Sequence, residues 1–111
     1  ENGKYQEAVN FFKFLTTIDL AKKKHWVGLG ASFQMLQEQE QAINAYTIAA
    51  LLDPADPYIP FYAAECCFKQ GCTQRGLDAL DCAEELTDSD DKFKGLKKRI
   101  RFLREAWSPG Q

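Results

Sequence analysis

KKHWVGLGASFQMLQEQEQAINAYTIAALLDPAD, residues 23–56, carries the pattern of two helices packed closely side by side. Trp26 and Gly30 lie in the first half of this segment, and Ala42 and Tyr46 lie in the second. Small residues allow two helices to approach closely, and large aromatic residues fill the space beside the contact. We therefore expect a helical hairpin over this segment.

The same pattern recurs along the chain with a step of 34 residues. The positions that repeat are small residues at Ala8, Ala42 and Gly76, and turn residues at Gly3, Gln37 and Gly71. This step is the length of the tetratricopeptide repeat, a helix pair that stacks on its neighbours to form a solenoid. Eight residues of the segment fit that repeat in register: Trp26, Leu29, Gly30, Phe33, Ala42, Tyr46, Ala49 and Pro54. We therefore expect an all-α tetratricopeptide-repeat solenoid, that is, an α-α superhelix.

The repeat register divides the chain. The expected parts are a partial first repeat over residues 1–22, a second repeat over 23–56, a third over 57–90, and a C-terminal capping helix and tail over 91–111. The expected helices span about 4–19, 23–36, 38–52, 57–70, 73–86 and 91–107, and Asp56 is expected to cap the fourth, with Pro57 at its first position. Because residue 1 falls at an inter-helix turn and no initiator Met is present, we expect a fragment of a longer protein.

The last expected helix is amphipathic and basic. Its apolar stripe consists of Phe93, Leu96, Ile100, Leu103 and Trp107. Residues 1–91 hold 7 Lys/Arg and 15 Asp/Glu, giving −8, and residues 92–111 hold 7 Lys/Arg and one Asp/Glu, giving +6. A solenoid needs a terminal helix with one apolar and one polar side, so capping is the first interpretation. The alternatives are contact with an anionic membrane surface, nucleic acid or an acidic partner segment, of which nucleic acid is disfavoured.

Composition and motifs argue against chemistry at a catalytic or metal centre. No apolar run approaches the roughly 18 residues that span a membrane, so stable membrane insertion is not expected. The four cysteines, Cys66, Cys67, Cys72 and Cys82, indicate reduced thiols in a reducing cytoplasm, with a redox or metal role as the weaker alternative. His25 is the single histidine, and no Ser, Cys or carboxylate has a spacing that would recruit it as a base. We expect no catalytic residue, no metal and no cofactor.

The candidate binding residues lie on the first helix of each repeat, which lines the concave wall of such a stack. The expected groove residues are Lys24, Val27, Ala31, Gln34, Met35, Tyr58, Phe61, Tyr62, Glu65 and Phe68. Flexible Met35 and the aromatic residues would accept apolar side chains of an extended peptide. The alternative is that the aromatic residues are ordinary packing residues. Val27 and Tyr62 stand where carboxylate-clamping repeats carry Lys, Asn or Arg, so an acidic C-terminal ligand is disfavoured.

Three stretches go beyond the general repeat pattern: HWVGLGA at residues 25–31, AYTIAALLD at 45–53, and PFYAAEC at 60–66. Together they resemble the class II chaperones of bacterial type III secretion. Pro60 is the most specific point of likeness, because that family also departs from the general repeat there. The chain differs from relatives at Tyr62, where they often carry His, and in its more basic last helix.

The resemblance implies a function. Members of this family hold two hydrophobic translocator proteins in the bacterial cytoplasm, keeping them soluble and apart before export. They bind an extended Pro-x-Leu-x-x-Pro segment in the concave groove, and many form homodimers through N-terminal helices. The competing hypothesis is a generic tetratricopeptide scaffold that joins two folded proteins through other surfaces.

Overall fold

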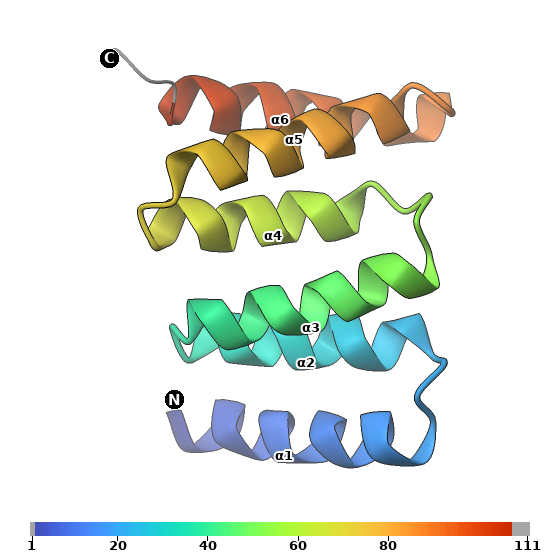
Figure 1. Cartoon of the computed structure of the whole chain (residues 1–111), viewed down its shortest axis with the longest axis vertical. Coiled ribbons are helices and arrows are strands. Elements are labelled where there is room, and N and C mark those ends of the chain that lie inside the picture. The colour runs from blue at the N-terminus through green and yellow to red at the C-terminus, as the bar shows by residue number, and fades with distance from the viewer. Residues whose placement is uncertain (1, 108–111) are drawn as a thin grey trace. The chain divides into compact units, whose positions relative to one another are not determined.

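The computed structural model describes residues 2–107. Within that range all regular structure is helical, and the helices divide into two compact units that meet in sequence at Pro54 and Ala55. The break lies two residues before the predicted boundary after Asp56. Each unit is described below by itself (Figure 1). The tail at 108–111 lies outside the described residues.

The first unit contains α1 (Asn2–Ile18), α2 (Lys23–Met35) and α3 (Gln39–Leu52), with α2 packed against both of the others (Figure 1). A Cβ atom added to Gly30 would lie 2.6 Å from Cε1 of Tyr46, so only glycine fits that contact between α2 and α3. Ala42 is fully buried in the same unit. The predicted close approach of these two helices is therefore confirmed. An ion pair of 2.8 Å between Lys23 and Asp53 joins the start of α2 to the end of α3.

Two inter-helix turns fit the 34-residue register. Gln37 has φ of 64° and Gly71 has φ of 84°, both in the left-handed region that turns after helices commonly use. The positions are equivalent in the second and third repeats. Gly3, the third member of the set, lies inside α1, because that helix already begins at Asn2.

The second unit contains α4 (Tyr58–Lys69), α5 (Thr73–Thr87), a single 3-10 turn η1 (Asp91–Phe93) and α6 (Lys94–Ala106). The Asp56 carboxylate accepts a hydrogen bond of 2.9 Å from the backbone N–H of Tyr58, so the predicted cap is present. The Asp90 carboxylate accepts one of 2.9 Å from Lys92 N–H at the start of η1. The predicted helix over 91–107 therefore begins as a 3-10 turn before it becomes α-helical.

The core of the second unit lies between α4, α5 and α6. Its buried residues are Phe61, Ala64, Phe68, Leu80, Ala83, Leu96 and Ile100. Leu96 and Ile100 belong to the predicted apolar stripe of α6, and Trp107 at its end stacks on Phe68 with ring centroids 5.3 Å apart. The capping helix thus covers the apolar sides of α4 and α5, as solenoid ends require.

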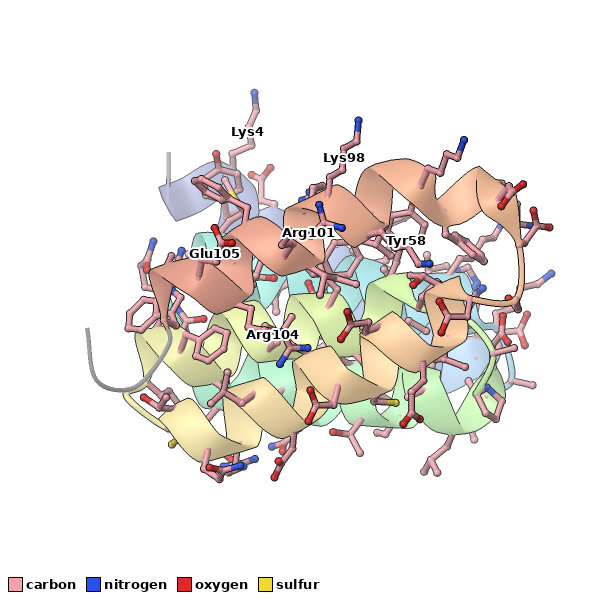
Figure 2. All side chains as sticks on the ribbon, turned by 90° about the horizontal axis from the view of Figure 1, so that it is seen from above. Lys4, Tyr58, Lys98, Arg101, Arg104 and Glu105 are labelled. Atoms are coloured by element: carbon pink, nitrogen blue, oxygen red, sulfur yellow. The ribbon has the colours of Figure 1, made fainter. Side chains whose placement is uncertain are left out.

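Ion pairs on the surface hold α6 in the same position. Arg104 contacts Asp81 at 2.9 Å and Glu84 at 2.8 Å, and Figure 2 shows its side chain pointing from α6 toward α5. Lys97 contacts Asp88 at 2.8 Å. Some of the basic residues of α6 therefore form ion pairs within the unit, with acidic residues of α5 and with Asp88 just after it.

Candidate functional site

The predicted groove residues lie on one helix of each unit, α2 in the first and α4 in the second. On α2, the exposed residues are Lys24, Ala31 and Met35, and the half-buried ones are Val27 and Gln34. Met35 has 51% of its surface exposed, which is large for an apolar side chain. Because methionine is flexible and polarisable, this exposed position suits contact with varied apolar side chains.

The α4 residues separate into two groups. Tyr58, Tyr62 and Glu65 are half-buried and follow one another at helical spacing, so they share one side of the helix. Phe61 is 2% exposed and Phe68 is 1% exposed, because both face α5 and α6 in the core.

Phe68 has little room to meet a ligand. Its ring lies against Gly76 of α5, where an added Cβ would lie 2.4 Å from Cε1 of Phe68. The ring also stacks on Trp107, which directly follows α6. This packing argues against the sequence-based assignment of Phe68 to the groove. The alternative interpretation, that it is a core residue, fits its surroundings. Phe61 is also a core residue, but its ring lines a surface recess described below.

The tyrosines of α4 form an aromatic cluster with the segment that precedes α6. The Tyr58 ring lies 6.2 Å from that of Tyr62 and 6.1 Å from that of Phe93. Burial raises the pKa of the Tyr62 hydroxyl above its ordinary value, although nearby Arg99 acts in the opposite direction. The hydroxyl is therefore protonated at neutral pH and can donate or accept a hydrogen bond.

A third surface, missed by the sequence analysis, lies between α4 and α6. A recess of about 360 Å³ opens there, lined by Phe61, Glu65, Lys98, Arg99, Phe102 and Leu103. Phe102 is 75% exposed, and the Arg99 guanidinium lies 4.7 Å from the centre of the Phe61 ring. The repeat register would have found this surface. A step of 34 from Glu65, Phe68 and Lys69 leads to Arg99, Phe102 and Leu103, which places α6 where a further first helix would stand.

The acidic, histidine and cysteine side chains form no catalytic or metal centre that can be recognised among residues 2–107. Among residues 2–107, no group of three or more His, Cys, Asp or Glu side chains could hold a metal ion. The four cysteines are free, and burial raises the pKa of the Cys66 thiol to about 12, so it is protonated and a weak nucleophile at neutral pH. No helix in the described part of the chain is long and apolar enough to cross a membrane.

Comparison with known proteins places this geometry in a family. The sequence model of the tetratricopeptide repeat matches residues 1–20 and 24–56. The chain is similar to the type III secretion chaperone SycD of Yersinia enterocolitica, solved in complex with a peptide of the translocator YopD. Identity is 34% and the TM-score is 0.89, over 94% of this chain and 79% of that one. The chain belongs to the translocator chaperones of type III secretion.

Other translocator chaperones give the same picture. PcrH of Pseudomonas aeruginosa, solved with the chaperone-binding region of PopD, is 31% identical with a TM-score of 0.90, over 96% of this chain and 80% of that one. Low calcium response locus protein H of Yersinia pestis is 33% identical over 96% of this chain. The chain spans 63% of the length of that curated relative. These matches confirm the family named from the sequence and the all-α tetratricopeptide-repeat fold.

Proposed function

We propose that the chain is a non-enzymatic chaperone that binds an extended segment of hydrophobic type III secretion translocator proteins in the bacterial cytoplasm. It would keep these proteins soluble and apart before export. The observation that carries this proposal is the pair of faces on α2 and α4, which combine exposed Met35 with half-buried tyrosines. SycD and PcrH, with the same fold, were solved with translocator peptides.

The proposed ligand is a Pro-x-Leu-x-x-Pro segment, and the chemistry of the two faces suits it. Proline and an extended backbone are already ordered before binding, so little conformational entropy is lost on association. Small residues such as Ala31 leave room for the peptide backbone, and the Tyr62 hydroxyl offers a hydrogen-bonding group for its amides. Joining the two faces into one concave wall is part of the proposal, as is the division into repeats at 1–22, 23–56 and 57–90.

The absence of a catalytic role is also proposed. Support comes from the protonated, buried Cys66 and from the nature of the relatives, which are chaperones. We further propose self-association, since one structure of SycD is described as an alternative dimer. The apolar residues of α1 that would mediate this contact are considered in the Discussion.

The generic scaffold is the second candidate, and one observation favours it. Leu51, near the end of α3, is 76% exposed, and α3 is the second helix of its pair. A scaffold that joins folded proteins would use such a surface. The two functions therefore predict different sensitivities at Met35 and Leu51.

A peptide titration separates them. A synthetic Pro-x-Leu-x-x-Pro peptide is titrated into the wild-type chain and into the Met35→Glu and Leu51→Glu variants, following tryptophan fluorescence. Both substitutions place the same charge on an exposed apolar position of the first unit, so they are matched for stability. We expect saturable binding, weakened about tenfold or more by Met35→Glu and about twofold or less by Leu51→Glu. If the Met35→Glu variant binds the peptide as tightly as the wild type does, α2 is not part of the binding site. If the wild type does not bind the peptide, the scaffold hypothesis is favoured.

A further inference from the structure

The recess between α4 and α6 is part of one unit and has a defined construction. Its apolar walls are the edge of Phe61, the exposed ring of Phe102 and the half-buried Leu103. Lys98 and Arg99 stand beside these walls, and Figure 2 shows Lys98 projecting away from α6. A volume of about 360 Å³ is at the small end of ligand sites. It is enough for one or two side chains rather than a folded domain.

The charges around the recess are unbalanced. Among the described residues, Arg104 of α6 is paired with carboxylates of α5 and Lys97 with Asp88 just after α5, whereas Lys98 and Arg99 make no ion pair. The Arg99 guanidinium instead lies over the Phe61 ring, which holds it at the entrance. Glu65 is the single acidic residue of the lining. The net charge of the lining is therefore positive, and it favours a ligand with carboxylates next to its apolar part.

We propose that this recess is a second docking subsite for the translocator cargo. It would take an aromatic or large aliphatic side chain that is flanked by Asp or Glu in an extended segment. The apolar side chain would lie between Phe61, Phe102 and Leu103, while the neighbouring carboxylates would pair with Lys98 and Arg99. This inference rests on the proposed chaperone function, because it adds a second stretch of the same unfolded cargo.

A lipid surface fits the same residues less well. A helix that binds a membrane surface presents a continuous apolar face to it. On α6 that face is already used, because Leu96 and Ile100 are buried in the core of the unit. Phe102 is the large apolar side chain of α6 that stays open, and it borders a recess instead of a flat apolar face. A single peptide side chain is thus the better match.

The test uses the whole chain and two ligands measured separately. The first is an end-capped nine-residue peptide with a central Phe between Asp and Glu residues, and a version with Lys in place of the acids is its control. The second is the Pro-x-Leu-x-x-Pro peptide. The protein variants are Phe102→Ser, Lys98→Glu and Arg101→Glu. Arg101→Glu is the matched control, because it changes the same charge on the same helix but lies outside the recess, beside Glu84 and Asp88.

We expect the acidic peptide to bind the wild type and the Lys-containing peptide not to bind. Phe102→Ser and Lys98→Glu should each weaken binding about tenfold, and Arg101→Glu about twofold at most. Circular dichroism should show unaltered folding, since all three substituted side chains are exposed. All variants should keep wild-type affinity for the Pro-x-Leu-x-x-Pro peptide.

Three results would overturn the subsite: no binding of the acidic peptide, equal losses in Lys98→Glu and Arg101→Glu, or no loss in Phe102→Ser. Equal losses would indicate general charge attraction. Binding to phosphatidylserine vesicles without binding to the acidic peptide would assign α6 to a membrane surface. Failure of the Pro-x-Leu-x-x-Pro peptide alone would instead count against the proposed function, so the two failures can be told apart.

Discussion

Gly76 and Gly95 are both helical glycines of the second unit, but their surroundings differ. A Cβ at Gly76 would lie 2.4 Å from the Phe68 ring, which is buried and stacked on Trp107. A Cβ at Gly95 would meet nothing within 4 Å. Alanine gains up to about 1 kcal/mol over glycine inside a helix, whereas overpacking a core costs about 1–3 kcal/mol. At Gly76 the cost of the clash should therefore exceed the gain in helix propensity, whereas at Gly95 there is no clash to offset that gain.

We predict that Gly95→Ala is neutral or stabilising and that Gly76→Ala is less stable than Gly95→Ala by about 1–3 kcal/mol. Chemical denaturation followed by circular dichroism measures both free energies of unfolding. Equal stability of the two variants would mean that the Phe68 ring can move aside to make room for the added methyl group.

The attachment of α6 to the second unit rests mainly on apolar burial. Ile100 is buried in the core, whereas the ion pairs of Arg104 with Asp81 and Glu84 are partly exposed to solvent. Truncating a buried isoleucine to alanine costs about 2–5 kcal/mol, and exposed ion pairs contribute about 1 kcal/mol or less. We predict a large loss of stability in Ile100→Ala and a small one in Arg104→Gln.

Thermal unfolding at low and high salt distinguishes the two contributions. The loss in Arg104→Gln should shrink at high salt, because screening already weakens the ion pairs of the wild type, and the loss in Ile100→Ala should not change. Phe102→Ala is the control, since Phe102 is exposed and its truncation should alter stability by about 0.5 kcal/mol at most. A larger loss in Arg104→Gln than in Ile100→Ala would show that charge, not burial, holds the capping helix.

The helix α4 shows how far sequence reasoning reached and where it stopped. The sequence predicted a helix over 57–70 with an Asp56 cap, because caps and prolines act locally; the cap is present, and the helix itself runs from Tyr58 to Lys69, so Pro57 precedes it. The sequence did not predict which aromatic residues of α4 are buried in the core and which are half-buried. Phe61 and Phe68 pack toward α6, and the repeat register considers only the partner helix within a repeat. The capping helix adds a second neighbour, so residues assigned to an open face become core residues.

For the whole chain, the fold class and family followed from residues 23–56 and from the unusual Pro60, and both were confirmed. The groove residues remain a proposal, and the α4–α6 recess was missed. The cause is the same in both cases. Repeat patterns fix which residues are small or large, but side-chain exposure depends on what covers each face, and α6 lies one repeat step beyond α4, where the sequence analysis expected only a capping helix.

An exposed apolar face on α1 predicts self-association of the chain. Phe11, Phe14 and Ile18 of α1 are 57%, 60% and 62% exposed and lie three or four residues apart, so they share one face of the helix. Burying such a side chain contributes about 1.5–3 kcal/mol, and a face of this kind favours association. We predict that sedimentation velocity detects a concentration-dependent dimer.

Charge on that face should oppose the dimer. Phe14→Glu should raise the dimer dissociation constant about tenfold or more, because a carboxylate would lose its hydration in the contact. Leu51→Glu on α3 adds the same charge to another exposed apolar position and should leave the dissociation constant nearly unchanged. A monomer at all concentrations would reject self-association of this chain. If both variants raise the dissociation constant equally, the dimer contact does not lie specifically on the exposed apolar face of α1.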